Sequence, residues 1–400
     1  MSFISDTLKR IKPSATMVIT AKAAQLKREG KKVIGLSSGE PDFDTPRHVK
    51  EAAIEAINKG HTKYTNIEGI PELRQSIVEK FKKDNNLDYN INEIIVGTGG
   101  KQILYNALVS SLNETDEVII PAPYWVSYPD MTLLAGGKPI IINCPSETDF
   151  KLTAEALEKV ITKNSKWLIL NSPSNPTGSC YSKEELEAIA KVVRKYDNLH
   201  VMTDDIYEYI IYDNYDFFTF AQVAPDLKDR TLTVNGVSKS YCMTGWRIGY
   251  AAGPEKLIKA MIKIQGQSTS NPSSISQYAA MAGIGGSKDF LKPCLDAFDE
   301  RRHFLVNKLN SIPGISCIMP KGAFYAYPNV QGLLGKTTKH GKVLTNDTEI
   351  VEWLLDEAEV AAVPGAAFGL EPYFRVSYAT SLDLLKESMN RIEKAVLSLS

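Results

Sequence analysis

The chain has 400 residues, of which 43% are hydrophobic and 23% charged, so it can form more than one domain and has the composition of a folded globular protein. Its 46 basic and 47 acidic side chains give a net charge of −1, which argues against nucleic acid or an anionic membrane as the main partner. Without an apolar stretch of signal-peptide or membrane-span length, and with five scattered cysteines that form no CxxC pair, the chain is expected to be cytoplasmic.

Secondary-structure signals alternate along the first two thirds of the chain. Residues 1–45 combine a helix pattern with the loop SSGEPDFDTP, and Pro46 is expected in the first turn of a second helix that ends before Gly60. An amphipathic pattern predicts a helix over residues 184–196. Short apolar runs predict strands buried on both faces at residues 94–96, 118–120, 139–143, 167–170, 199–203, 231–234 and 248–251. This alternation predicts an α/β fold with a mostly parallel sheet and helices on both faces.

The C-terminal part has a different pattern. A long charged helix is expected over residues 291–309 and short alternating segments follow, such as residues 374–378, while the polar residues 331–347 are expected to form a surface loop. We therefore expect a large domain of residues 46–289 and a smaller α+β domain of residues 1–45 and 290–400. The five histidines have no metal-ligand spacing, so no metal site is predicted. Gly335-Lys336-Thr337 ends like a phosphate-binding loop but lacks the earlier glycine and a preceding buried strand, which disfavours a nucleoside triphosphatase.

Polar side chains follow three consecutive predicted strands. Asn175 follows the strand at 167–170, Asp204, Asp205 and Tyr207 follow the strand at 199–203, and Lys239 follows the strand at 231–234. Alone, Asn175 would also suit a turn, Asp204 a helix cap and Lys239 a solvated loop. Together they are harder to explain in that way, because the carboxyl ends of parallel strands meet in one ligand-binding crevice.

These groups suit one kind of chemistry. The amine of Lys239 can form a Schiff base with a carbonyl cofactor, and the carboxylate of Asp204 can keep a pyridine nitrogen protonated. Asn175 and Tyr207 can hold a phenolate oxygen of the same ring. The glycine-rich residues 97–102 join a strand to a helix, where free backbone N–H groups would bind a phosphate, although an ordinary strand–helix turn has the same composition.

The chain resembles the class I pyridoxal-phosphate-dependent aminotransferases, specifically the bacterial branch of aspartate and aspartate/prephenate aminotransferases. The resemblance runs through KPSAT, SSGEPDFDTP, KYTNIEGIPELR, GTGGKQ, PAPYWVSYP, NSPSNPTG, TDDIYE, SKSYCMTGWRIGYAAG, GAFY, VPGAAFG and FRVSYA, in family order. It implies the type I fold of pyridoxal-phosphate-dependent transferases, with a seven-stranded, mostly parallel sheet in the large domain and a smaller α+β domain.

The resemblance also implies a cofactor site for pyridoxal 5'-phosphate. Lys239 matches the lysine that binds the cofactor covalently and moves the substrate proton, and Asp204 matches the partner of the pyridine nitrogen. The other matching contacts are Tyr207 and Asn175 at the phenolic oxygen, Trp125 stacked on the ring, and Gly99, Gly100, Lys101, Ser238 and Arg247 around the phosphate. Tyr64 matches a tyrosine that reaches the phosphate in the neighbouring subunit, which implies a homodimer with shared active sites.

Substrate contacts follow from the same resemblance. Arg375 matches the arginine that binds the α-carboxylate, beside Gly39, Trp125 and Asn175. Within the branch, Thr16 and Lys101 match the residues that bind the distal carboxylate, and Lys12 matches a position linked to prephenate use, although a surface lysine on the first helix would look the same. Asp205 departs from the glutamate usual in the family. Some aspartate aminotransferases use an arginine of the partner subunit for the distal carboxylate, and none is identifiable in this sequence.

The implied reaction is the reversible transfer of the amino group from L-aspartate to 2-oxoglutarate by a ping-pong mechanism, with prephenate as a further candidate substrate. An aromatic or alanine aminotransferase, or a lyase with the same cofactor, is the alternative within the fold. A non-enzymatic regulator would need an added DNA-binding segment, for which residues 1–45 are too short.

Overall fold

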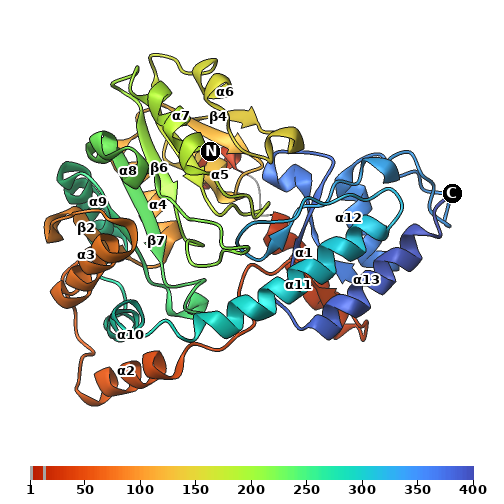
Figure 1. Ribbon diagram of the computed structural model, residues 1–400, viewed down its shortest axis with the longest axis horizontal. Coiled ribbons are helices and arrows are strands. Elements are labelled where there is room, and N and C mark those ends of the chain that lie inside the picture. The colour runs from red at the N-terminus through yellow and green to blue at the C-terminus, as the bar shows by residue number, and fades with distance from the viewer. Residues whose placement is uncertain (1–2, 12–14) are drawn as a thin grey trace.

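The computed structural model describes residues 3–11 and 15–400, and its centre is a seven-stranded sheet with the strand order β2-β8-β7-β6-β5-β3-β4 (Figure 1). Neighbouring strands are parallel except around β8, which is antiparallel to both β2 and β7. The strands are β2 (Ile94–Gly97), β3 (Glu117–Ala122), β4 (Lys138–Asn143), β5 (Ser165–Asn171), β6 (His200–Asp204), β7 (Thr231–Gly236) and β8 (Gly249–Ala252). Every one of the predicted strands is confirmed, as is the α/β class.

Helices cover both faces of this sheet, because successive side chains of a strand point to opposite sides. On β5, Trp167 and Ile169 pack with α4 (Gly100–Ser111), α5 (Ser127–Leu134) and α9 (Glu255–Ser268). Leu168 and Leu170 pack on the other face with α7 (Lys183–Val193) and α8 (Phe220–Val223). β4 departs from the prediction of burial on both faces: it is the edge strand, and Ile141 is 40% exposed.

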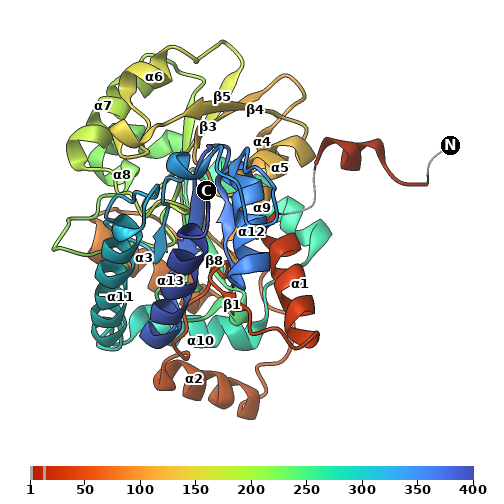
Figure 2. The same ribbon diagram turned by 90° about the vertical axis from the view of Figure 1, so that its right-hand side faces the viewer.

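The second group of elements combines both ends of the chain. Antiparallel strands form the order β11-β12-β9, and Figure 2 shows the helices of this group next to one another. Its elements are α1 (Ala15–Arg28), β1 (Ile34–Gly35), α11 (Leu291–Ser311), β9 (Tyr325–Ala326), α12 (Asp347–Glu357), β10 (Val360–Ala361), β11 (Val363–Pro364), β12 (Phe374–Ser377) and α13 (Leu382–Val396).

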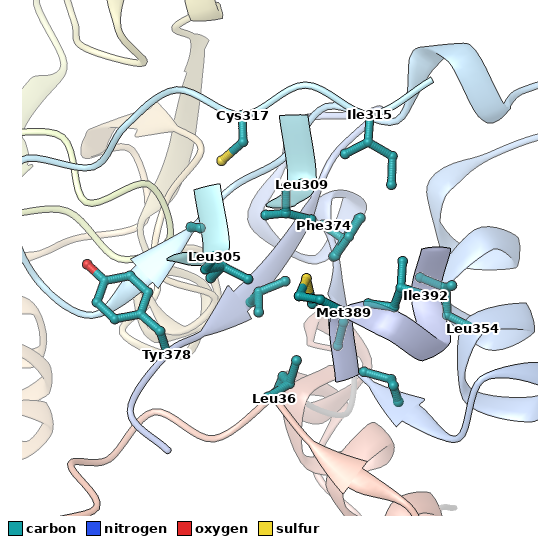
Figure 3. Packing of buried hydrophobic residues seen from close by; sticks show 14 of the residues in the cluster. Leu36, Leu305, Leu309, Ile315, Cys317, Leu354, Phe374, Tyr378, Met389 and Ile392 are labelled. Carbon is teal, nitrogen blue, oxygen red and sulfur yellow. The ribbon is translucent and has the colours of Figure 1, made fainter. Parts of the chain in front are cut away.

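A shared hydrophobic cluster ties the N-terminal residues to the C-terminal ones. Leu36 lies in the same cluster as Leu309 of α11, Phe374 of β12 and Met389 of α13, and all four are fully buried (Figure 3). β1 also pairs in parallel with β10. On this packing we propose the division expected above, with residues 1–45 and 290–400 as a smaller domain beside residues 46–289.

Local details correct three expectations. α7 ends at Val193, not at residue 196. Pro46 occupies the N-cap of α2 (Arg47–Asn58) and not its first turn. Residues 331–347 are more than a surface loop, because Leu333 and Leu344 are fully buried in the C-terminal cluster.

The remaining helices are α3 (Pro71–Asn85), α6 (Ala154–Glu158) and α10 (Ser274–Gly285). Among residues 3–11 and 15–400, no helix combines the length and apolarity that a bilayer crossing needs.

Candidate active site

Lys239 lies in the loop that follows β7. Its Nζ donates to the carbonyl oxygen of Gly39 at 2.5 Å, so the middle of the chain meets the N-terminal segment here. Burial lowers the pKa of Lys239 to about 8, and the positive charge of Arg375 acts in the same direction. A lysine amine with this pKa can exchange a proton near neutral pH.

Asp204 ends β6 and lies next to Asn171, which ends β5 in the register of the sheet. The hydroxyl of Tyr128, from α5, donates to Asp204 Oδ2 at 2.7 Å, and Asn171 Nδ2 donates to the backbone carbonyl of Asp204 at 2.7 Å. Burial raises the pKa of Asp204 to about 6, while the Tyr128 hydrogen bond acts against that rise. Asp204 is therefore a buried acid that is held in place by hydrogen bonds and has a pKa about one unit below neutral pH.

Arg375 brings a buried positive charge from β12 to the same place. Its Nη1 donates to Asn175 Oδ1 at 2.9 Å and its Nη2 donates to the carbonyl of Ser37 at 2.6 Å. The guanidinium carbon lies 4.6 Å from the ring centre of Tyr325, and Nε has no hydrogen-bond partner within the described chain. A buried guanidinium without a carboxylate has unused capacity to bind an anion.

Two tyrosines close the side of the site near Gly39. The hydroxyls of Tyr207 and Tyr325 are 2.8 Å apart and both side chains are buried. Burial raises the pKa of each, so both hydroxyls stay protonated at neutral pH and can donate hydrogen bonds. A Cβ on Gly39 would lie 3.0 Å from the Tyr325 hydroxyl, which explains why a glycine suits this position.

The start of α4 and the guanidinium of Arg247 form the opposite end. Gly99 has a φ of +82°, and a Cβ there would lie 2.3 Å from Nη2 of Arg247. Gly249 leaves similar room, since its Cβ would lie 2.2 Å from the backbone nitrogen of Gly100. The ammonium of Lys101 lies 4.8 Å from the ring centre of Trp125. Helix N–H groups next to a guanidinium form an anion-binding site.

These groups surround one cavity of about 290 Å³. The predicted site residues that line it are Gly39, Gly100, Lys101, Trp125, Asn175, Asp204, Tyr207, Ser238, Lys239, Arg247 and Arg375. Its lining combines a lysine amine whose pKa is lowered to about 8, a buried carboxylic acid and two groups of residues that can bind anions.

A family model described as aminotransferase class I and II matches residues 31–392. The chain belongs to this aminotransferase family. It is 55% identical over 400 residues to an aspartate/prephenate aminotransferase of Cereibacter sphaeroides, with 100% of both chains covered. It is 56% identical over 400 residues to a probable aspartate/prephenate aminotransferase of Rickettsia felis, covering 100% of this chain and 98% of that protein. The predicted family resemblance is confirmed.

Solved structures agree with the fold of this aminotransferase. The aspartate aminotransferase of Rhizobium meliloti matches with a TM-score of 0.98 and 51% identity over 100% of both chains. The aspartate aminotransferase of Thermus thermophilus with maleate matches with a TM-score of 0.92 and 40% identity, covering 99% of this chain and 100% of that one. The expected type I fold is therefore confirmed.

Other predicted site residues of the aminotransferase lie elsewhere. Gly99 packs behind Arg247 and does not line the cavity as the structure describes it. Tyr64 is 91% exposed and also lies outside the cavity of its own chain. Lys12 falls outside the described residues. Thr16 belongs to α1, but its side chain is likewise outside what is described.

Sequence reasoning missed several lining residues, above all Tyr128, Asn171 and Tyr325. Each lies inside a motif that was recognised: Tyr128 in PYWVSYP, Asn171 in NSPSNPTG and Tyr325 in GAFY. The available signal was the place of Tyr128 three residues after Trp125, where α5 begins; its backbone N–H donates to the carbonyl of Trp125 at 3.0 Å.

Proposed function

We propose that this aminotransferase transfers the amino group of L-aspartate to 2-oxoglutarate, giving oxaloacetate and L-glutamate, and that prephenate is a second amino acceptor. The observation that carries the proposal is that two cationic side chains line the same cavity: Arg375, which is buried near Lys239, and Lys101, which lies over the ring of Trp125. The substrate of an aspartate aminotransferase carries two carboxylates. Relatives at 55% and 56% identity bear the aspartate/prephenate name.

The residues of the cavity fit pyridoxal 5'-phosphate. Because Gly99 and Gly249 have no Cβ, the guanidinium of Arg247 and the backbone of Gly100 can pack closely against them at the start of α4. Gly100, Arg247 and Ser238 line this end of the cavity and would hold the phosphate. The remaining contacts would be Asp204 at the ring nitrogen, Asn175 and Tyr207 at the phenolic oxygen, Trp125 on the ring face and Lys239 at the aldehyde carbon. When bound, the cofactor supplies an electron sink for the bond that breaks at the substrate Cα.

Lys239 is the proposed proton carrier. Lowering its pKa to about 8, from an ordinary value near 10.5, raises the uncharged fraction at pH 7 from about one in 3,000 to about one in ten. An uncharged amine can take the proton from the substrate Cα, and the resulting ammonium can give that proton up again within the same half-reaction; the second half-reaction uses the same transfers in reverse. The carbonyl oxygen of Gly39 accepts a hydrogen bond from this amine and so helps to fix its position.

Arg375 is the proposed anchor of the α-carboxylate. Asn175 and Ser37 fix its guanidinium by two hydrogen bonds, so little side-chain entropy remains to be lost when a carboxylate binds. Lys101 is the proposed contact of the second carboxylate. Burial and the positive charge of Arg247 lower the pKa of Lys101, and a carboxylate bound beside its ammonium would raise that pKa again. Thr16 remains a prediction for the same carboxylate, and Lys12 remains a prediction for prephenate use.

We also propose a cytoplasmic homodimer in which Tyr64 of each subunit completes the cavity of the other. Tyr64 is 91% exposed, and Ile54 and Ile57 on nearby α2 are also more than half exposed. Apolar side chains that are exposed together in this way are typical of a subunit interface. The five free cysteines are compatible with a reducing compartment.

A paired-substrate assay tests the specificity. The purified, cofactor-loaded protein is given 2-oxoglutarate with aspartate, alanine or phenylalanine, and separately prephenate with glutamate or aspartate as donor. The proposal expects aspartate to have the highest kcat/KM among the donors, and glutamate-dependent or aspartate-dependent loss of prephenate. An aromatic preference is the second candidate, since an aromatic aminotransferase of Pyrococcus horikoshii matches with a TM-score of 0.85 and 39% identity. No glutamate formed from aspartate would refute the main proposal.

A further inference from the structure

A buried ion pair involves the residue that directly follows Tyr207. Lys80 Nζ, from α3, lies 2.5 Å from Glu208 Oε1 and donates to Glu208 Oε2 at 2.7 Å, and the two side chains are only 1% and 3% exposed. Asn85, the last residue of α3, completes the group, since its Oδ1 accepts from Lys80 at 2.7 Å and its Nδ2 donates to Glu208 Oε2 at 3.4 Å. None of the three lines the cavity that the described residues form.

The helix that supplies Lys80 is well anchored. Ile77 and Phe81, three residues before and one residue after Lys80, are fully buried and share a hydrophobic cluster with Tyr250 of β8. The ammonium of Lys80 also lies 4.8 Å from the ring centre of Phe81. The ion pair therefore ties Glu208, which is 128 residues further along the chain, to a helix that packs on the central sheet.

The backbone of Glu208 belongs to the same turn as Tyr207. Glu208 N donates to the carbonyl of Asp205 at 2.9 Å, and Ile210 N donates to the carbonyl of Tyr207 at 2.8 Å. The hydroxyl of Tyr207 reaches the cavity, where it lies 2.8 Å from the hydroxyl of Tyr325. A displacement of Glu208 would therefore displace Tyr207 as well.

The next residue along the turn is bound to the same helix. The hydroxyl of Tyr209 donates to Asp84 Oδ2, and Asp84 belongs to α3. Lys288, which lies between α10 and α11, donates to the Asp84 carboxylate and to the Tyr209 hydroxyl, each at 2.8 Å. Two consecutive side chains, Glu208 and Tyr209, thus attach this turn to α3.

A buried ion pair acts on position more than on stability. Taking two charges out of water costs about as much free energy as their attraction returns, so apolar side chains of similar size are often equally stable. A buried charge that has lost its partner is strongly unfavourable, however, so neither group can move away from the other. The Lys80–Glu208 pair therefore restricts the position of the turn more strictly than apolar contacts would.

We propose that Lys80 and Glu208 are positioning residues, which hold the Tyr207 hydroxyl where it donates to the phenolic oxygen of the cofactor. The inference rests on the proposed cofactor contact of Tyr207. A hydroxyl that donates to a phenolate oxygen favours its ionised form, and so lowers the pH at which the bound cofactor loses its proton. Displacing this hydroxyl should raise that pH by about one unit, which is tenfold in proton affinity.

The test is an absorbance titration of the bound cofactor in the full-length enzyme. Lys80→Met/Glu208→Leu replaces the ion pair by apolar side chains and leaves the net charge unchanged, so a shift of the midpoint reports position and not charge. We expect its midpoint to rise by about one pH unit, while the cofactor-free protein melts close to the wild-type temperature. Glu208→Gln keeps the shape of the side chain and should shift the midpoint less, in the same direction.

Lys308→Met is the matched control. It breaks an ion pair of 2.7 Å with Glu393, between α11 and α13, and this contact involves neither α3 nor the turn of Tyr207. The control should keep the wild-type midpoint; a shift equal to that of Lys80→Met/Glu208→Leu would refute the positioning role.

Tyr207→Phe separates this inference from the proposed cofactor contact. We expect it to raise the midpoint, and Lys80→Met/Glu208→Leu to add no further shift when combined with it, because the two changes act through one contact. An unchanged midpoint in Tyr207→Phe would refute the cofactor contact and this inference together.

The other outcomes concern the positioning role alone. That role is refuted if Tyr207→Phe shifts the midpoint and Lys80→Met/Glu208→Leu does not; if the latter fails to fold, Glu208→Gln decides in its place. A full additional shift in the combined variant would show that the ion pair acts by another route, which also refutes the role. The titration needs no amino acid substrate, so failure of the aspartate assignment would leave it readable.

Discussion

Replacement of Tyr128 by phenylalanine removes one oxygen atom from the site and leaves the ring that packs beneath the sheet. That oxygen donates to Asp204 Oδ2 at 2.7 Å in a buried setting. A hydrogen bond to a charged group contributes about 1.5–3 kcal/mol, which equals a shift of about 1–2 pH units in the titration of Asp204. Burial has already raised its pKa to about 6 and the Tyr128 bond opposes this, so the variant titrates at higher pH.

The assay is the pH dependence of cofactor affinity in the cofactor-free protein, followed by the absorbance of bound pyridoxal 5'-phosphate. We expect the acidic loss of affinity in Tyr128→Phe to move up by about 1–2 pH units, and kcat/KM at pH 7 to fall by about 10-fold to 100-fold.

Tyr181→Phe is the matched control. Tyr181 is also buried, but its hydroxyl accepts from the backbone of Leu152, away from Asp204. If the pH midpoint of cofactor binding is the same in Tyr128→Phe as in the wild-type protein, or if Tyr181→Phe shifts it equally, the Tyr128 hydrogen bond does not set the pKa of Asp204.

Four further substitutions test the remaining assignments. Lys239→Ala should bind the cofactor without a covalent link and lose essentially all turnover; cofactor that stays attached after borohydride reduction and denaturation would place the link elsewhere. Arg375→Ala should raise KM for every amino acid alike, whereas Lys101→Ala should weaken dicarboxylates more than alanine, and steady-state kinetics with both substrate types distinguishes the two. Gly99→Ala places a Cβ 2.3 Å from Arg247 Nη2 at a φ of +82°, so it should weaken cofactor binding by about 1–3 kcal/mol, measured as Kd. Unchanged affinity would mean that Arg247 is not the phosphate ligand.

The sheet and the core of the site could be predicted because both depend on short-range signals. Buried strands of a parallel sheet are short apolar runs, and the residues that end β5, β6 and β7 fall at one edge once those strands are neighbours. The same reasoning predicts that Asn175, Asp204 and Lys239 share one crevice, and all three line the cavity.

Other contacts depend on how distant elements pack, which spacing alone does not encode. Tyr325 reaches the cavity from β9, a two-residue strand too short to leave a pattern. Leu333 and Leu344 lie in a polar stretch and are buried because a cluster of distant helices surrounds them.

The hydrogen bonds at Gly39 and Ser37 have a consequence for biosynthesis. Gly39 binds Lys239, 200 residues further along the chain, and Ser37 binds Arg375, 338 residues further along. At about 5–20 residues per second, a ribosome needs roughly 17–68 s to add the 338 residues that separate Arg375 from Ser37. During that time the nascent chain lacks the guanidinium that completes the cavity wall, and the carbonyl of Ser37 has no Arg375 to bind.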